Sequence, residues 1–135
     1  MAKLCQQTPL PIALDEELIG VLPTGEMERM LQKIRPQFII LKPTLLGDFE
    51  RCDLWMEMAD ALDIGYWITS ALESNVGLNA LAQYTYARGL EMPQGLGTGG
   101  LFSNNVEGPL RVREGHLFYH PSEAWNLEVL SDVSL

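Results

Sequence analysis

Residues that can bind or react follow short apolar segments at four places in the chain. They are Asp15, Lys42, Thr69 with Ser70, and Gly95 with Gly97. A carboxylate and an ammonium group can bind ligands or move protons, hydroxyls can donate and accept hydrogen bonds, and glycines allow a ligand to approach the backbone. The apolar segments recur at steps of about 27, 27 and 25 residues, which is typical of one strand and one helix per step.

Lys42 ends the run Phe38–Leu41, in which four large apolar residues follow one another without polar alternation. Such a run is typical of a strand that is covered on both faces, as in a parallel sheet. Pro43 favours extended backbone at Lys42, and we expect a loop over Thr44–Gly47. Barrel and open α/β folds carry their chemistry at this end of the strands. The alternative is a lysine that only reaches the surface where the strand leaves the core.

Four strands and three helices are predicted to position these residues. The strands are Leu10–Leu14, Phe38–Lys42, Gly65–Thr69 and Leu90–Met92. The first helix begins near Thr24 and ends before Pro36, with apolar residues spaced at i, i+3, i+4 and i+7. The second is capped by Asp48 and runs to about Leu62. Its apolar stripe consists of Phe49, Cys52, Trp55, Met56 and Ala59. The third covers roughly 72–88, where Ser70 and Glu73 match a capping box.

The chain changes character after the last predicted strand. The segment Pro93–Gly100 is rich in glycine and loosely resembles a dinucleotide-binding loop, but it follows three strand–helix units where such a loop opens the first. Residues 110–119 are predicted to form a hairpin that turns near Glu114-Gly115. His116 and His120 are too isolated to be predicted metal ligands. We expect the tail from Pro121 to pack against another domain or subunit.

Composition excludes several classes of protein. The 135 residues are 47% hydrophobic and 20% charged, and the formal net charge is −9. This charge argues against binding nucleic acid or an anionic membrane surface, and no apolar run approaches the roughly 20 residues of a membrane span. Cys5 and Cys52 lack metal-ligand spacing, so we expect reduced thiols in a cytoplasmic protein, with a disulfide between them as the alternative.

The order of these elements predicts an α/β protein: the C-terminal half of a (β/α) TIM-like barrel, with about four βα units, followed by a β-hairpin and tail. Residues 1–108 would be the partial barrel and residues 109–135 the hairpin and tail. The carboxyl ends of barrel strands share one rim, so Asp15 and Lys42 are predicted neighbours. Half a barrel has open sheet edges and an exposed core face, which would favour a homo-oligomer.

Four motifs follow one another along the chain, namely Ile12–Glu16, Ile40–Gly47, Thr69–Gly77 and Pro93–Gly99. In this order they resemble the enolase superfamily, and within it the o-succinylbenzoate synthase family of the muconate-lactonizing-type subgroup. The resemblance implies a metal-dependent lyase of menaquinone biosynthesis that works on a small carboxylate substrate through an enediolate intermediate. It implies a separate capping domain, toward which residues 109–135 would pack.

The resemblance also implies roles for single residues. Asp15 matches the last of three acids that hold a divalent metal, usually Mg²⁺, and Lys42 matches the sixth-strand lysine that stabilises the enediolate. Substrate contacts are implied for Thr69, Ser70, Gly95 and Gly97, and Glu73 matches a family glutamate. The chain lacks counterparts of the other metal acids, the second-strand lysine and the capping domain. We therefore expect a C-terminal fragment that is inactive without the missing N-terminal part.

Two alternatives remain open. Dipeptide epimerases and N-acylamino acid racemases share these motifs, and part of their specificity lies in the missing capping domain. A non-catalytic half-barrel that oligomerises through its open edges is the alternative from another class.

Overall fold

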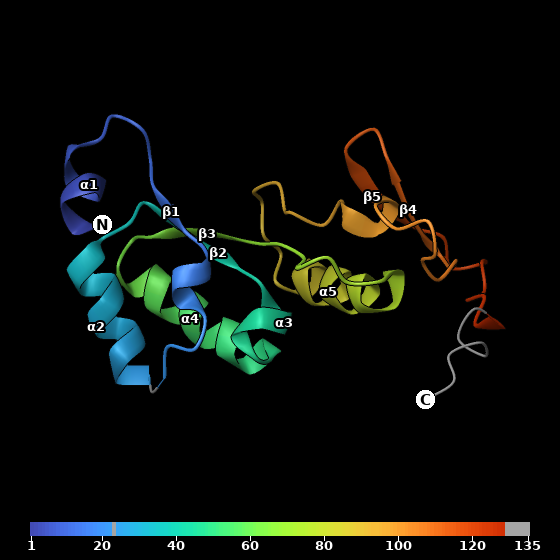
Figure 1. Cartoon of the computed structure of the whole chain (residues 1–135), viewed down its shortest axis with the longest axis horizontal. Coiled ribbons are helices and arrows are strands. Elements are labelled where there is room, and N and C mark those ends of the chain that lie inside the picture. The colour runs from blue at the N-terminus through green and yellow to red at the C-terminus, as the bar shows by residue number, and fades with distance from the viewer. Residues whose placement is uncertain (23, 129–135) are drawn as a thin grey trace. The chain divides into compact units, whose positions relative to one another are not determined.

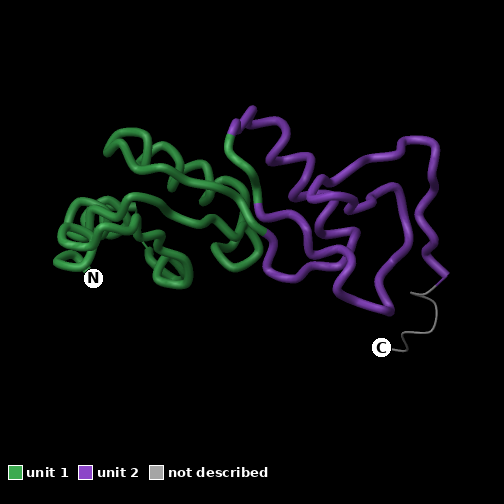
Figure 2. The backbone as a smooth tube through the Cα atoms, turned by 90° about the horizontal axis from the view of Figure 1, so that it is seen from above, with its two compact units in different colours: residues 1–69, 92–94 green, residues 70–91, 95–135 purple. Residues whose placement is uncertain are grey.

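A computed structural model describes residues 1–22 and 24–128 of the chain. These residues form two compact units, which Figure 2 distinguishes by colour. Unit 1 consists of Met1–Thr69 with Met92–Gln94, and unit 2 consists of Ser70–Glu91 with the residues from Gly95 onward. Among the described residues, no helix is both long enough and apolar enough to cross a bilayer.

Unit 1 is built on a three-stranded parallel sheet in the order β1-β2-β3. Figure 1 labels these strands. The strands are β1 (Ala13–Leu14), β2 (Phe38–Leu41) and β3 (Gly65–Ile68). The helical segments are α1 (Ala2–Gln7), the 3-10 turn η1 (Glu16–Leu18), α2 (Thr24–Ile34), α3 (Pro43–Leu46) and α4 (Phe49–Ala61). In the register, Ala13 pairs with Phe38, and Phe38 pairs with Gly65. Three of the predicted strands are therefore confirmed as parallel neighbours.

The core of unit 1 follows from the apolar pattern of its strands and of α4. Leu14, Ile39 and Ile68 are fully buried, one from each strand. The predicted cap of α4 is confirmed, because the Asp48 carboxylate accepts a hydrogen bond from the Arg51 backbone N–H at 2.7 Å. Four residues of the predicted α4 stripe are buried, namely Cys52, Trp55, Met56 and Ala59. Phe49 was predicted to join them but is exposed, because it is the first residue of the helix.

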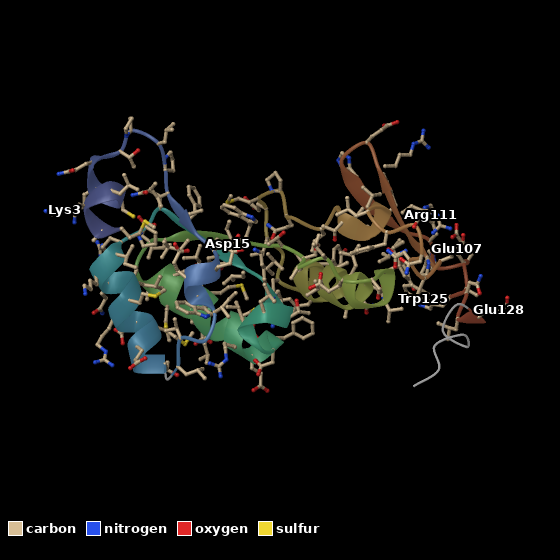
Figure 3. The ribbon with its side chains drawn as sticks, viewed as in Figure 1. Lys3, Asp15, Glu107, Arg111, Trp125 and Glu128 are labelled. Atoms are coloured by element: carbon tan, nitrogen blue, oxygen red, sulfur yellow. The ribbon has the colours of Figure 1, made fainter. Side chains whose placement is uncertain are left out.

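Unit 2 contains α5 (Asn75–Ala87), the 3-10 turn η2 (Thr98–Gly100) and a hairpin of β4 (Leu110–Arg113) and β5 (His116–Tyr119). The predicted hairpin is confirmed, with Arg113 paired to His116 beside the turn. Its core cluster consists of Leu78, Leu81, Leu96 and Leu110. The segment after the hairpin folds back, because the Asn126 backbone N–H donates to the Glu107 carbonyl at 2.9 Å. Figure 3 labels Glu107 and Trp125 in this part of unit 2.

Two predictions of local structure after β2 and β3 are wrong. The expected loop after Lys42 contains α3, because Pro43 suits the first helical position and the Lys42 carbonyl accepts two backbone N–H groups at 2.9 Å. The third helix begins at Asn75 and not near residue 72, and the Ser70–Glu73 capping box does not form. Leu72 has a left-handed φ of 69°, which interrupts any helix there.

The predicted strand Leu90–Met92 does not form. The Gln94 side chain provides one hydrogen bond that such a strand would make to β3, because its Oε1 accepts the Ile68 N–H at 2.7 Å. The chain is therefore α/β with three parallel strands and a hairpin among its described residues. The proposed division into residues 1–108 and 109–135 stays a prediction, and residues 129–135 of the predicted tail lie outside the described part.

Candidate functional site

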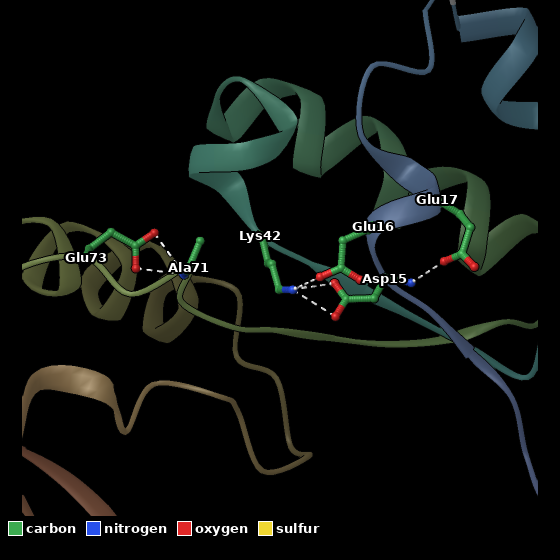
Figure 4. Close-up of polar contacts among 6 residues, drawn as sticks. All are labelled: Asp15, Glu16, Glu17, Lys42, Ala71 and Glu73. Carbon is green, nitrogen blue, oxygen red and sulfur yellow. Dashed lines mark hydrogen bonds and ion pairs between the residues drawn. The ribbon is translucent and has the colours of Figure 1, made fainter. Parts of the chain in front are cut away.

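Asp15 and Lys42 meet at the carboxyl edge of the sheet in unit 1. Each follows a strand directly, Asp15 after β1 and Lys42 after β2, and parallel strands end at the same edge. The Lys42 Nζ lies 2.8 Å from both carboxylate oxygens of Asp15 (Figure 4). The same Nζ lies 3.0 Å from Oε1 of Glu16. The structure thus brings together the two residues predicted to be neighbours and adds a second carboxylate.

The two carboxylates beside Lys42 differ in their exposure to solvent. Lys42 is 16% exposed and Asp15 is 28% exposed, whereas Glu16 is 70% exposed. Hydrogen bonding to Asp15 is the largest cause that raises the pKa of Lys42, Glu16 adds to it, and burial opposes it. Hydrogen bonding to Lys42 lowers the pKa of Glu16. Lys42 is therefore a protonated ammonium at neutral pH.

Thr69 belongs to the same edge of the sheet. Its backbone N–H donates to the Leu41 carbonyl at 2.9 Å, which continues the pairing of β2 with β3 by one step. This step places Thr69 beside Lys42 in the register. Unit 1 thus presents Asp15, Lys42 and Thr69 at the ends of three adjacent strands.

The other predicted site residues, Ser70, Gly95 and Gly97, belong to unit 2. The Ser70 backbone N–H donates to the Gly95 carbonyl at 3.0 Å. The Ser70 hydroxyl lies 2.6 Å from the Thr98 hydroxyl, and Ser70 is 6% exposed. The predicted rim that joins all six residues spans both units and stays a prediction.

Glu73 has a local role in unit 2 that differs from the predicted cap. Both of its carboxylate oxygens accept the Ala71 backbone N–H, at 2.8 and 3.0 Å (Figure 4). Its side chain passes close to Gly77, where a Cβ atom would lie 2.9 Å from the Glu73 Cβ. The glutamate therefore stabilises the turn that precedes α5.

Sequence reasoning did not assign Glu16 or Thr98 to the site. Glu16 had a signal, because it follows Asp15 directly at a strand end. The sequence gives no signal for Thr98 beyond its place among the glycines, since its contact with Ser70 joins residues 28 positions apart. Both predicted non-ligand histidines, His116 and His120, are exposed.

The residues of this chain do not by themselves fit a magnesium site. Mg²⁺ prefers octahedral coordination by several oxygen ligands. Asp15 is the one predicted ligand, and both of its oxygens are within 2.8 Å of Lys42. Within residues 1–22 and 24–128, no group of three or more His, Cys, Asp or Glu residues could hold a metal ion.

Comparison with known proteins identifies relatives of this chain, although no family model matches it. It is 56% identical over 117 residues to an o-succinylbenzoate synthase of Desulfotalea psychrophila, covering 87% of this chain and 32% of that protein. An o-succinylbenzoate synthase of Vibrio cholerae is 39% identical over 104 residues, covering 76% of this chain and 30% of the relative. The chain thus spans about a third of the length of the curated relatives it matches.

Solved structures agree with these relatives. MenC from Desulfotalea psychrophila superposes with a TM-score of 0.82 at 55% identity, covering 87% of this chain and 33% of that chain. The muconate lactonizing enzyme of Pseudomonas putida has a TM-score of 0.75 at 21% identity, covering 96% of this chain and 37% of that chain, which shows a shared fold. The predicted resemblance to the enolase superfamily and to o-succinylbenzoate synthases is confirmed, as is the predicted fold class of a C-terminal barrel portion.

Proposed function

We propose that this chain, whose relatives are o-succinylbenzoate synthases, is the C-terminal part of such an enzyme. The complete cytoplasmic protein would be a lyase of menaquinone biosynthesis that dehydrates a succinyl-hydroxycyclohexadiene carboxylate to o-succinylbenzoate. The observation that carries this proposal is the Lys42 ammonium, held 2.8 Å from Asp15 at the shared edge of β1 and β2. The 56% identity to a synthase supports the same conclusion.

Lys42 has the properties of a cation that stabilises negative charge on a substrate. Its pKa is raised chiefly by hydrogen bonding to Asp15, so it holds its proton at neutral pH. A lysine that must accept a proton works best with a lowered pKa. Lys42 therefore suits electrostatic stabilisation of an enediolate, and we propose that Thr69, Ser70, Gly95 and Gly97 contact the substrate.

We propose that Asp15 is one metal ligand of the complete protein and that Mg²⁺ is the metal. The remaining ligands would come from protein outside this chain, because the described residues offer no complete site. We therefore propose that the chain alone is inactive.

Complementation tests this proposal in a strain that lacks o-succinylbenzoate synthase. One gene encodes this chain alone, and a second joins it to the remaining part of the Desulfotalea psychrophila synthase. We expect rescue of quinone synthesis by the hybrid alone. Lys42→Ala and Asp15→Ala should abolish rescue, while Lys33→Ala, which removes an exposed lysine from α2 of the same unit, should not.

The other outcomes distinguish the alternatives. Rescue by the short chain would refute the proposed inactivity. A folded hybrid that fails to rescue but racemises N-acylamino acids would support an epimerase or racemase. Rescue that survives Lys42→Ala would refute the catalytic role of Lys42 and favour a non-catalytic half-barrel.

A further inference from the structure

The glycine-rich segment Gly95–Gly100 is attached to Ser70, in the turn before α5 of unit 2. The Ser70 backbone N–H donates to the Gly95 carbonyl at 3.0 Å, and the hydroxyls of Ser70 and Thr98 lie 2.6 Å apart. Two of the residues in these contacts, Ser70 and Gly95, are proposed substrate contacts. Thr98 has no assigned role in that proposal.

The Ser70 hydroxyl can bind Thr98 because it does not cap a helix. Leu72 has a left-handed φ of 69° and α5 begins only at Asn75, so no helical N–H group follows Ser70 at capping distance in the sequence. Glu73 binds the Ala71 N–H instead. The turn thus presents a buried hydroxyl to the glycine-rich segment.

Thr98 has the one side chain in the segment Gly95–Gly100 that can form a hydrogen bond, since the others are four glycines and Leu96. Leu96 packs in the apolar cluster with Leu78. The next residue after Thr98 is also held, because the Asn105 side-chain amide donates to the Gly99 carbonyl at 2.8 Å. Gly97 lies between the Leu96 and Thr98 attachments and is exposed.

We propose that Thr98 is a positioning residue of the proposed substrate site: its hydroxyl orients Ser70 and fixes the backbone at Gly97 for a carboxylate substrate. This inference rests on the proposed function. A flexible glycine-rich backbone pays an entropy cost when it is ordered by a ligand, and a hydroxyl bond made beforehand lowers that cost. Thr98 therefore acts on substrate affinity and not on the chemical step.

The test compares Thr98→Val, which keeps the shape and removes the hydroxyl, with Thr98→Ser, which keeps the hydroxyl. The matched control is Thr85→Val in α5, because the Thr85 hydroxyl is buried and has no hydrogen-bond partner among the described residues. Steady-state kinetics are measured on the hybrid synthase with its carboxylate substrate. Amide hydrogen exchange of residues 95–100 is measured on this chain itself.

We expect Thr98→Val to raise KM about fivefold to tenfold, the worth of one hydrogen bond, and to change kcat less than about twofold. Exchange at residues 95–100 should accelerate by a similar factor. Thr98→Ser and Thr85→Val should behave as the unsubstituted protein in both measurements.

Four results would overturn the inference: an unchanged KM, a loss confined to kcat, a KM effect without faster exchange, or a Thr98→Ser variant that behaves as Thr98→Val. If the unsubstituted hybrid is folded and inactive, the proposed function fails by itself. The exchange measurement on this chain then decides whether Thr98 fixes the glycine-rich segment, and unchanged exchange would refute it.

Discussion

Removing the charge of Lys42 should reveal how strongly it couples to Asp15. The variants are Lys42→Met, Asp15→Asn and the double variant, which form a thermodynamic cycle. Lys42→Met alone leaves the Asp15 carboxylate, which is 28% exposed, without the cation 2.8 Å away. We therefore expect the destabilisation of unit 1 by the two single variants, added together, to exceed the destabilisation by the double variant.

The expected coupling follows from distance and burial. Two unit charges 2.8 Å apart attract by about 6 kcal/mol at an effective dielectric constant of about 20. Desolvation of both groups offsets most of this attraction, so the net value should be near that of a hydrogen bond between charged groups, about 1.5–3 kcal/mol. Glu16 is 70% exposed, and its coupling to Lys42 should be smaller than that of Asp15.

Urea unfolding at neutral pH measures the cycle. The fluorescence of Trp55, which is fully buried in α4, and of Trp67 in β3 reports unit 1, and a Trp125→Phe background removes the tryptophan of unit 2. A parallel cycle with Glu16→Gln provides the exposed comparison. Raising the salt concentration should reduce the Glu16 coupling more than the Asp15 coupling, because screening acts mainly on exposed charges.

A coupling between Lys42 and Asp15 below about 0.5 kcal/mol, the value of an ordinary surface pair, would refute this reasoning. An Asp15 coupling no larger than that of Glu16 would refute the assignment of Asp15 as the principal partner.

Three further predictions concern the sheet, the thiol and the cap of unit 1. Gly65→Ala should lower the free energy of unfolding by about 1–3 kcal/mol, because the new Cβ atom would lie 2.5 Å from the Phe38 ring. The control is Gly25→Ala, where the added Cβ atom would meet open space. The urea midpoints of both variants measure the effect. Burial, and then nearby carboxylates, raise the pKa of Cys52 to about 12, so native Cys52 should resist iodoacetamide at pH 9 in mass spectrometry. Because the unfolded thiol ionises near pH 8.5, the Cys52 contribution to stability should fall as pH rises from there toward 12; labelling of the native thiol would contradict this. Asp48→Ala should cost about 1 kcal/mol in thermal or urea unfolding through loss of the α4 cap, and no change would show that water replaces it.

The elements that follow from local pattern could be predicted from the sequence. The apolar run Phe38–Leu41 forms β2, Asp48 caps α4, and Glu114-Gly115 lies at the hairpin turn between β4 and β5. Each depends on residues close together in the chain. Regular spacing of the first three strands then predicted their parallel order and the meeting of Asp15 with Lys42.

Elements that depend on distant contacts could not be predicted in this way. Ser70 and Glu73 have the spacing of a capping box, but Ser70 binds Thr98 and Glu73 binds Ala71. The strand expected at Leu90–Met92 is absent, while the Gln94 side chain binds the Ile68 N–H. At Ser70 and at Ile68 a side chain from another segment competes successfully with the local pattern, and no spacing rule in the sequence describes that competition.

Glu16 reconciles the two roles proposed for the end of β1. Asp15 is the partner of Lys42 in this chain and a proposed metal ligand in the complete protein. A carboxylate that binds a metal ion and an ammonium group at once binds each of them more weakly than it would alone. Glu16 reaches the same Nζ at 3.0 Å, so Lys42 keeps a carboxylate partner when Asp15 binds elsewhere. Two acids beside one lysine leave a net negative charge at this edge, which favours a cation there. The same arrangement accounts for a protonated Lys42 in the isolated chain and is compatible with the metal-binding role that we propose for Asp15 in the complete protein.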